Sequence, residues 1–312
     1  MVHRNNPYWV YPELLAFYED QGLTATFFFL GRAWEGFSYR YNIHRKPFRQ
    51  LIRRIEQHGH EVGLHSSLHA FKHPRRIRRE KNRLEQVTRH SLTGVRQHYL
   101  RLEFPRAWSL FHQAGLRYDS SVGSNRGLGF PTGSSFPYLP AQCGVEVPES
   151  LVEIPFAVMD YPWKHLGDID RAWEHFQNLA YNIRNSQGHL CLLWHPSNLA
   201  ETDFRPLWER FFLWMATQNA FVTTLDQMAT WWVSRHRVLL KTLQIENDRI
   251  SLLLETPAEI RGLTLEIFSE EALSLEHSVG SLMPIDGKRY FLILPQLRPG
   301  QTPVRLSRKT QK

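Results

Sequence analysis

Two histidines follow a predicted strand at a spacing that suits metal binding. They are His65 and His69, in the run His65-Ser-Ser-Leu-His69, at the end of the apolar segment 60–65. On a helical turn, side chains at positions i and i+4 lie on one face, where two neutral imidazoles can hold one metal ion. Zinc, cobalt, nickel and iron(II) all accept imidazole ligands. The spacing therefore predicts a divalent-metal site. The alternative is a pair of exposed polar residues at the start of a helix.

A third histidine stands where a buried strand stops. In Leu192-Leu-Trp-His-Pro196 the apolar run ends in His195, which a proline follows. Histidine is the side chain that is most easily tuned for proton transfer near neutral pH. His195 is therefore a candidate general acid or base, and the alternative is a histidine that only caps a strand at the surface.

The elements that must position these side chains follow a βα pattern. From residue 8 to about 234, short apolar runs alternate with amphipathic segments, which is typical of a parallel sheet covered by helices. We predict strands at 24–30, 60–65, 94–96, around Tyr118, and at 152–154, 190–194 and 220–224. We predict helices at 11–21, 47–58, 75–92, 106–114, 170–185, 206–217 and 225–235. Such folds place their chemistry at the carboxyl ends of the strands, which is where His65 falls.

The pattern changes after residue 235. Short, often alternating strands are predicted at 238–245, 249–254, 263–267, 273–276 and 290–294, with turn sequences at Asn247-Asp248 and Asp286-Gly287. We predict two domains, an α/β domain over 1–235 and a small all-β sandwich over 236–312, with a polar, frayed tail from Arg305.

Composition narrows the class of protein. The chain has 312 residues, of which 42% are hydrophobic and 22% charged, as in ordinary globular proteins, and this excludes a disordered chain and a disulfide scaffold. Two cysteines, Cys143 and Cys191, are too few for a cysteine-rich zinc module. No apolar run reaches the roughly 18–20 residues that span a bilayer, and the N-terminus carries no apolar signal core. We therefore expect a cytoplasmic protein.

The charge is basic, at +8. The segment Arg75-Arg-Ile-Arg-Arg-Glu-Lys-Asn-Arg83 suggests a nucleic-acid-binding stripe, but no stacking aromatics are interleaved with its charges. The solvated face of a helix explains it better. Nucleic-acid binding is a distant alternative, and we expect no nucleic-acid partner.

Taken in order, the motifs resemble those of a known family. A Thr26-Phe-Phe-Phe strand, His-Ser-x-x-His after a strand, an arginine-bearing strand, Tyr118-Asp-Ser-Ser and a final Leu-x-His are similar to the polysaccharide deacetylase superfamily, the NodB-like enzymes of carbohydrate esterase family 4. The resemblance covers about residues 8–234. It implies an irregular seven-stranded (β/α) barrel and metal-dependent removal of acetyl groups from a glycan, with zinc as the expected ion and cobalt, nickel or iron as alternatives.

The resemblance also implies roles for individual residues. His65 and His69 correspond to the metal-binding histidines, His195 to the general acid, and Arg96 to the arginine that orients the catalytic aspartate. Asp160 is placed as the later carboxylate that tunes His195. Near the expected cleft, the side chains proposed to bind the sugar are Trp163, Trp194 and Tyr138.

One family motif is missing from the sequence. The first motif is a strand ending in two aspartates, one the catalytic base and one a metal ligand, and this chain has no aspartate before Asp20. Either the reading frame begins at an internal methionine, or the base has been lost. The sequence therefore predicts a deacetylase acting on an acetylated glycan, and the alternative is a catalytically silent homologue that binds carbohydrate.

Overall fold

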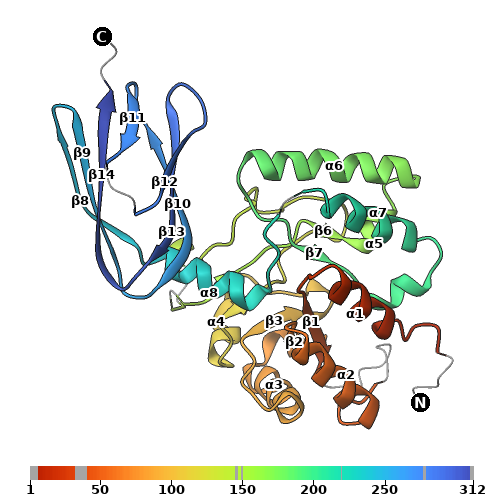
Figure 1. Ribbon diagram of the computed structural model, residues 1–312. Coiled ribbons are helices and arrows are strands. Elements are labelled where there is room, and N and C mark those ends of the chain that lie inside the picture. The colour runs from red at the N-terminus through yellow and green to blue at the C-terminus, as the bar shows by residue number, and fades with distance from the viewer. Residues whose placement is uncertain are drawn as a thin grey trace. The chain divides into compact units, whose positions relative to one another are not determined.

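The computed structural model describes residues 6–31, 41–144, 147–148, 150–218, 220–276 and 279–309 (Figure 1). The chain divides into two compact units, Met1–Ala229 and Thr230–Lys312. The predicted boundary lay between residues 235 and 236. In the part of the chain that is described, every helix is too short or too polar to cross a membrane.

A parallel sheet forms the centre of the first unit. Its strands are β1 (Thr26–Leu30), β2 (Glu61–Ser66), β3 (Gly94–Gln97), β4 (Tyr118–Asp119) and β5 (Val152–Glu153), which lie side by side in that order. Two further parallel strands, β6 (Val158–Met159) and β7 (Leu192–Leu193), pair with each other. Apolar side chains on β1 to β3, such as Phe27, Leu64 and Val95, belong to the core, as expected where both faces of a parallel sheet are covered.

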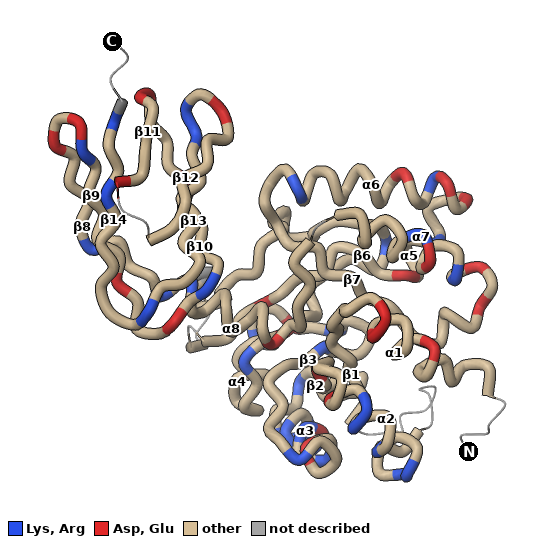
Figure 2. The backbone as a smooth tube through the Cα atoms, viewed as in Figure 1, with Lys and Arg blue, Asp and Glu red and all other residues tan. Residues whose placement is uncertain are grey.

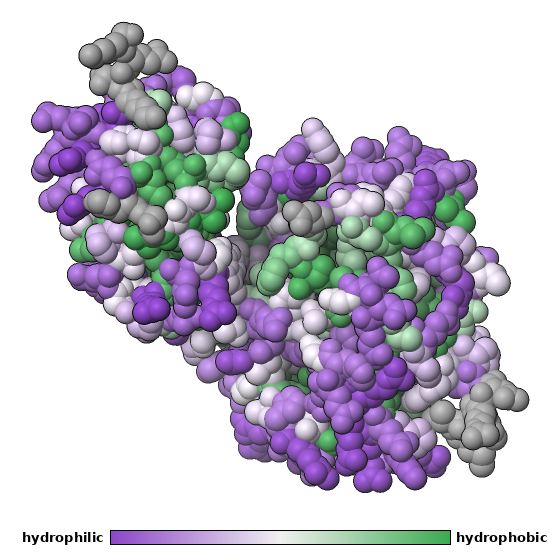
Figure 3. Space-filling model, viewed as in Figure 1, coloured by the Kyte–Doolittle hydropathy of each residue, from purple (hydrophilic) through white to green (hydrophobic). Residues whose placement is uncertain are grey.

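Helices separate most of these strands along the chain. They are α1 (Tyr11–Asp20), α2 (Lys46–Gln57), α3 (Pro74–Thr88), α4 (Arg106–Gln113), α5 (Asp160–Lys164), α6 (Ile169–Asn185), α7 (Arg205–Met215) and α8 (Leu225–His236). The basic helix α3 buries Ile77, Leu84 and Val87, while Lys and Arg colour much of its length (Figure 2). The surface over α2 and α3 is mostly hydrophilic (Figure 3). These helices are therefore amphipathic, with their apolar sides against the core.

The second unit is all antiparallel from β8 onward. One sheet has the order β11 (Ala272–Leu275), β14 (Gly300–Lys309), β9 (Arg249–Thr256) and β8 (Leu239–Glu246). The other has the order β10 (Ile260–Phe268), β13 (Arg289–Leu297) and β12 (Ser281–Pro284). Side chains from both sheets, including Leu254, Leu292 and Val304, meet in one apolar cluster. An α/β fold followed by a C-terminal antiparallel β region is thus confirmed, while closure of the barrel and the sandwich architecture stay predictions.

Two predicted segments are corrected. Residues 220–224 form no strand. The main chain just beyond them is instead held by side chains, because Leu225 N–H donates to Thr26 Oγ1 (3.0 Å) and Asp226 N–H to Glu61 Oε2 (2.9 Å). The tail expected to fray from Arg305 is β14 as far as Lys309, paired with β9 and β11. Its polar side chains alternate with the buried Val304 and Leu306, a period-2 pattern too short to stand out in the sequence.

Candidate functional site

His65 lies at the carboxyl end of β2, opposite Arg96 on β3. Its ring Nδ1 is 2.7 Å from the main-chain oxygen of Arg96. A carbonyl oxygen only accepts hydrogen bonds, so Nδ1 carries the proton and the lone pair of His65 is on Nε2. That Nε2 is 2.8 Å from Nδ1 of His98, which lies just beyond β3. Two imidazoles from neighbouring strands therefore meet at this edge of the sheet.

The environment keeps His65 neutral. Burial, and then the neighbouring His98, lower its pKa to about 3. A neutral imidazole with a lone pair on Nε2 is the form that binds a metal ion or accepts a proton.

The predicted geometry for His69 is wrong. His65 and Ser66 belong to β2, paired with Arg96 and Gln97, so residues 65–69 do not form a helical turn. His69 is exposed, at the start of a short 3₁₀ turn over Ala70–Lys72. The strand ladder continues one residue past the point where the sequence pattern placed its end. The assignment of His69 as a ligand stays a prediction.

Arg96 is buried between two aromatic rings. Its guanidinium lies 4.6 Å from the ring centre of Phe28 and 5.7 Å from that of Phe156. It donates from Nε to the main-chain oxygen of Ser120 (2.8 Å) and from a terminal nitrogen to Ser120 Oγ (2.7 Å). In the described part of the chain these hydrogen bonds tie β3 to the segment after β4. The predicted role of Arg96 beside a catalytic aspartate stays a prediction.

His195 is held by a buried carboxylate. Met159 on β6 lies opposite Leu193 on β7, so the residues that follow, Asp160 and His195, leave the strands at the same edge. His195 N–H donates to Asp160 Oδ2 (2.7 Å), and its ring Nδ1 is 2.9 Å from Oδ1. Asn198 Nδ2 also donates to Oδ2 (2.9 Å). Because the carboxylate accepts at Nδ1, the other ring nitrogen, Nε2, is left to face a reactant, on a side chain that is 52% exposed.

The predicted sugar-binding aromatics pack into the protein. Trp163 is fully buried, with Nε1–H donating to the main-chain oxygen of Ala172 (2.8 Å), so it does not offer a face to a sugar. The prediction that Trp163 binds a sugar is wrong, because apolar side chains from helices distant in the sequence cover its ring. Trp194 is half-buried against Trp163 and Phe204. Tyr138 is also half-buried and lies edge-on to Trp108.

Sequence reasoning missed His98 and a pair of carboxyl groups. His98 stands in Arg96-Gln-His98, two residues after the arginine that the resemblance singled out, and that position was the available signal. Asp119 and Glu153 lie opposite each other on β4 and β5 and are both fully buried. Burial raises the pKa of Asp119 to about 6, and burial together with the Asp119 charge raises that of Glu153 well above its usual range. No local pattern marks this pair, because it forms only when the strands pair.

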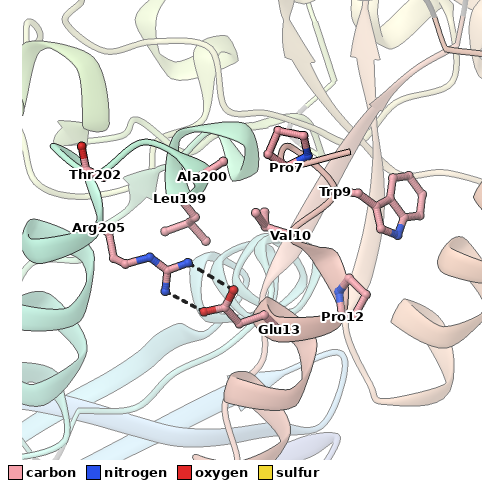
Figure 4. Close-up of a pocket in the computed structure, with 9 residues that line it drawn as sticks. All are labelled: Pro7, Trp9, Val10, Pro12, Glu13, Leu199, Ala200, Thr202 and Arg205. Atoms are coloured by element: carbon pink, nitrogen blue, oxygen red, sulfur yellow. Dashed lines mark hydrogen bonds and ion pairs between the residues drawn. The ribbon is translucent and has the colours of Figure 1, made fainter. Parts of the chain in front are cut away.

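An open cavity of about 410 Å³ lies between the N-terminal segment and residues that follow His195 in the sequence (Figure 4). Residues of the N-terminal segment, of the end of the Pro196–Ala200 turn and of the stretch that follows it line the cavity. Glu13 and Arg205 face each other across it in a two-bond ion pair of 2.6 and 3.2 Å. The cavity contains none of the predicted site residues.

The implied metal is only partly matched. A catalytic zinc site usually takes three protein ligands and a water. Among the described residues, no group of three or more His, Cys, Asp or Glu side chains is arranged to hold a metal ion. The described side chains therefore supply two converging imidazoles, which is an incomplete set.

Comparison with known proteins agrees with the motifs. Residues 6–111 match the polysaccharide deacetylase family model. The resemblance to polysaccharide deacetylases is confirmed. The matched stretch contains β1 to β3 with His65, His69, Arg96 and His98, whereas Asp160 and His195 lie beyond it. No curated protein sequence matches the chain.

Solved structures extend the likeness in fold beyond that stretch. A Mycobacterium smegmatis protein assigned to the polysaccharide deacetylases is 19% identical and has a TM-score of 0.55, over 77% of this chain and 82% of that one. A CE4 family pseudoenzyme from Bacillus anthracis is 12% identical, with a TM-score of 0.44 over 72% and 62% of the two chains. A peptidoglycan deacetylase from Bacillus subtilis is 15% identical, with a TM-score of 0.43 over 74% and 87%.

Proposed function

We propose that the first unit hydrolyses acetyl groups from an acetylated polysaccharide or other glycan. The family match supports a deacetylase role. The observation that carries the proposal is the contact between His195 and the buried Asp160, which fixes the imidazole and leaves Nε2 directed outward. A fixed imidazole of this kind is suited to giving a proton to a leaving group.

In the proposed reaction, water adds to the acetyl carbon and the bond to the sugar nitrogen or oxygen breaks. His195 gives the proton on Nε2 to the departing atom, the attacking water loses a proton to solvent, and solvent returns one to His195, so that the products are acetate and the free amine or hydroxyl. Asp160 accepts the hydrogen bond from His195 Nδ1 and so keeps that N–H pointed away from the substrate. His65, being neutral, adds no positive charge beside His195.

Two components of the family reaction remain predictions from the sequence. One is the divalent metal, expected to be zinc, which would polarise the acetyl carbonyl and a water when bound. The other is the aspartate that takes a proton from water. A positioned general base of this kind contributes about 10²–10⁴ in rate.

Acetate release tests the proposal. The protein is incubated with N-acetylglucosamine oligomers and with O-acetylated xylan, with and without Zn²⁺, and acetate is measured against the variant His195→Ala. Release above that of the variant supports the proposal. Binding of either glycan, measured by calorimetry, with acetate at the level of the variant would instead support a silent carbohydrate-binding homologue.

A further inference from the structure

Positive charge is concentrated on α2 and α3, two helices of the first unit that pack against each other (Figure 2). Helix α2 has four Lys or Arg residues and one Glu, and α3 has six and two. The two helices thus carry an excess of seven positive charges, against a net charge of +8 for the whole chain. We propose that their outer faces form a docking surface for the anionic head groups of a phospholipid membrane. The proposal does not depend on the deacetylase reaction, because membrane binding is measured without turnover.

The cationic side chains form one row along each helix, at spacings of three or four residues. They are Lys46, Arg49 and Arg53 on α2 and Arg75, Arg79 and Arg83 on α3, all of them exposed. Residues three and four apart lie on the same side of a helix. The opposite sides carry buried apolar side chains such as Ile52 and Ile77, so both rows face water. We call these six side chains the basic face.

Neighbouring carboxylates do not neutralise the basic face. Within the part of the chain that the structure describes, its six side chains take part in no ion pair. The acidic residues of the two helices have other partners. Glu56 pairs with His90 at 2.6 Å, Glu85 pairs with Lys81 at 2.6 Å, and Glu80 is buried. The basic face therefore presents uncompensated positive charge that attracts anions.

A recess of about 190 Å³ lies in the basic face on α2. Lys46, Arg49, Gln50 and Arg53 line it, so that three cations and one amide surround the space. Lysine and arginine are the side chains that bind phosphate, and arginine does so through two parallel hydrogen bonds. The recess therefore suits the phosphate of one head group, while the row on α3 meets the head groups beside it.

A lipid surface fits the basic face better than a nucleic acid does. Because α2 and α3 lie side by side, the cations are spread over the width of two helices instead of following one groove. Proteins that hold single strands add aromatic side chains on which bases stack, and many DNA-binding proteins insert one helix into the major groove. Phe48, the aromatic residue of α2, is buried, and α3 has none. The contact is therefore electrostatic, as for other clusters of basic residues on amphipathic helices.

Sedimentation of the full chain with lipid vesicles tests the proposal. The vesicles consist of phosphatidylcholine alone or of phosphatidylcholine mixed with phosphatidylglycerol. We expect binding to the mixed, anionic vesicles and release as NaCl is raised, because salt screens exposed charges. One basic residue near an anionic surface strengthens binding about fivefold, so Arg49→Gln/Arg53→Gln and Arg75→Gln/Arg79→Gln should each weaken it roughly 25-fold.

Two further variants separate the basic face from net charge and from folding. Arg171→Gln/Arg184→Gln removes the same charge from exposed positions on α6 and should bind as the unmodified chain does. Arg75→Lys/Arg79→Lys keeps the charge and should keep the binding. Circular dichroism checks that each variant is folded.

Three results would overturn the proposal. The first is equal binding to neutral and anionic vesicles, and the second is equal weakening by the α6 variant and the two variants of the basic face. The third is tighter binding to a DNA duplex than to anionic vesicles, lost in the same variants, which would assign the basic face to nucleic acid.

Discussion

Asp160 holds His195 through both its main chain and its ring. The His195 N–H donates to Oδ2 at 2.7 Å, and the ring Nδ1 lies 2.9 Å from Oδ1. The carboxylate is completely buried, while the imidazole that it holds is 52% exposed. A buried charge interacts strongly with its partner because little water screens it. This contact therefore fixes the His195 ring more firmly than a surface contact would.

Replacing Asp160 by Asn should lower kcat for acetate release by about 10²–10⁴, with a small effect on KM, because the ring loses the partner that fixes its tautomer. The pH profile of kcat should change as well. Steady-state kinetics with an acetylated glycan measures both. Asn198→Ala is the control, since it removes one donor from Asp160 and leaves both contacts with His195. Equal losses in kcat for the two variants would contradict the assignment.

Replacing Trp163 by Ala should lower the free energy of unfolding by about 3–5 kcal/mol, because a large, fully buried side chain leaves a cavity. Trp163→Phe keeps most of the ring volume and loses the hydrogen bond to Ala172, a loss of about 1 kcal/mol. Urea unfolding measures both changes. Glycan affinity of Trp163→Phe should equal that of the unmodified chain, and a large fall would restore the sugar-stacking role.

The Asp119–Glu153 pair should make stability depend on pH. Burial raises the pKa of Asp119 from 3.8 to about 6, and that of Glu153 is also raised, so the folded chain holds these protons more tightly than the unfolded chain. Stability from this pair is therefore greatest at low pH. The part due to Asp119 falls as pH rises from about 4 through 6, and the part due to Glu153 falls from about 4.5 upward, by at most about 1.4 kcal/mol per pH unit for each group.

Asp119→Asn should flatten this dependence. In the variant, Glu153 can ionise without a charged neighbour while it accepts hydrogen bonds from Trp108 Nε1 (2.9 Å) and Val122 N–H (3.2 Å). Urea unfolding at a series of pH values, with the unmodified chain as reference, isolates the contribution of the pair from those of other carboxylates. Parallel curves for the two proteins would contradict the assignment of this pH dependence to the Asp119–Glu153 pair.

The ion pair of Glu13 with Arg205 should stabilise the first unit only slightly. Both side chains are partly exposed, at 59% and 36%, so a double-mutant cycle should give about 0.2–1 kcal/mol. The hydrogen bond from Arg205 lowers the pKa of Glu13, and Arg205→Ala should raise it toward its ordinary value. Thermal unfolding and NMR titration measure these effects. The pair of Arg210 with Asp170, at 2.7 Å, serves for comparison, and a much larger coupling than in that pair would contradict the estimate.

The sequence by itself determined the local elements. The apolar spacing of Phe48, Leu51 and Ile55 gave α2 its buried face, and the run Thr26–Leu30 is a buried strand. Helix and strand periodicities depend on residues that are close together in the sequence, so they can be recognised without knowledge of the fold. The motifs around His65 and His195 are local as well, since each lies at the end of a strand, and their order along the chain identified the family resemblance.

Only the tertiary structure decided which side chains meet. His65 and His98 are 33 residues apart, and Asp160 and His195 are 35 apart. Each pair is brought together by the register of two parallel strands, a long-range property that no local period encodes. The same reason explains Trp163. The sequence suggested that its indole binds a sugar, whereas in the fold helices cover it and it is fully buried. It also explains β14, where pairing with β9 orders a tail that its polar composition predicted to fray.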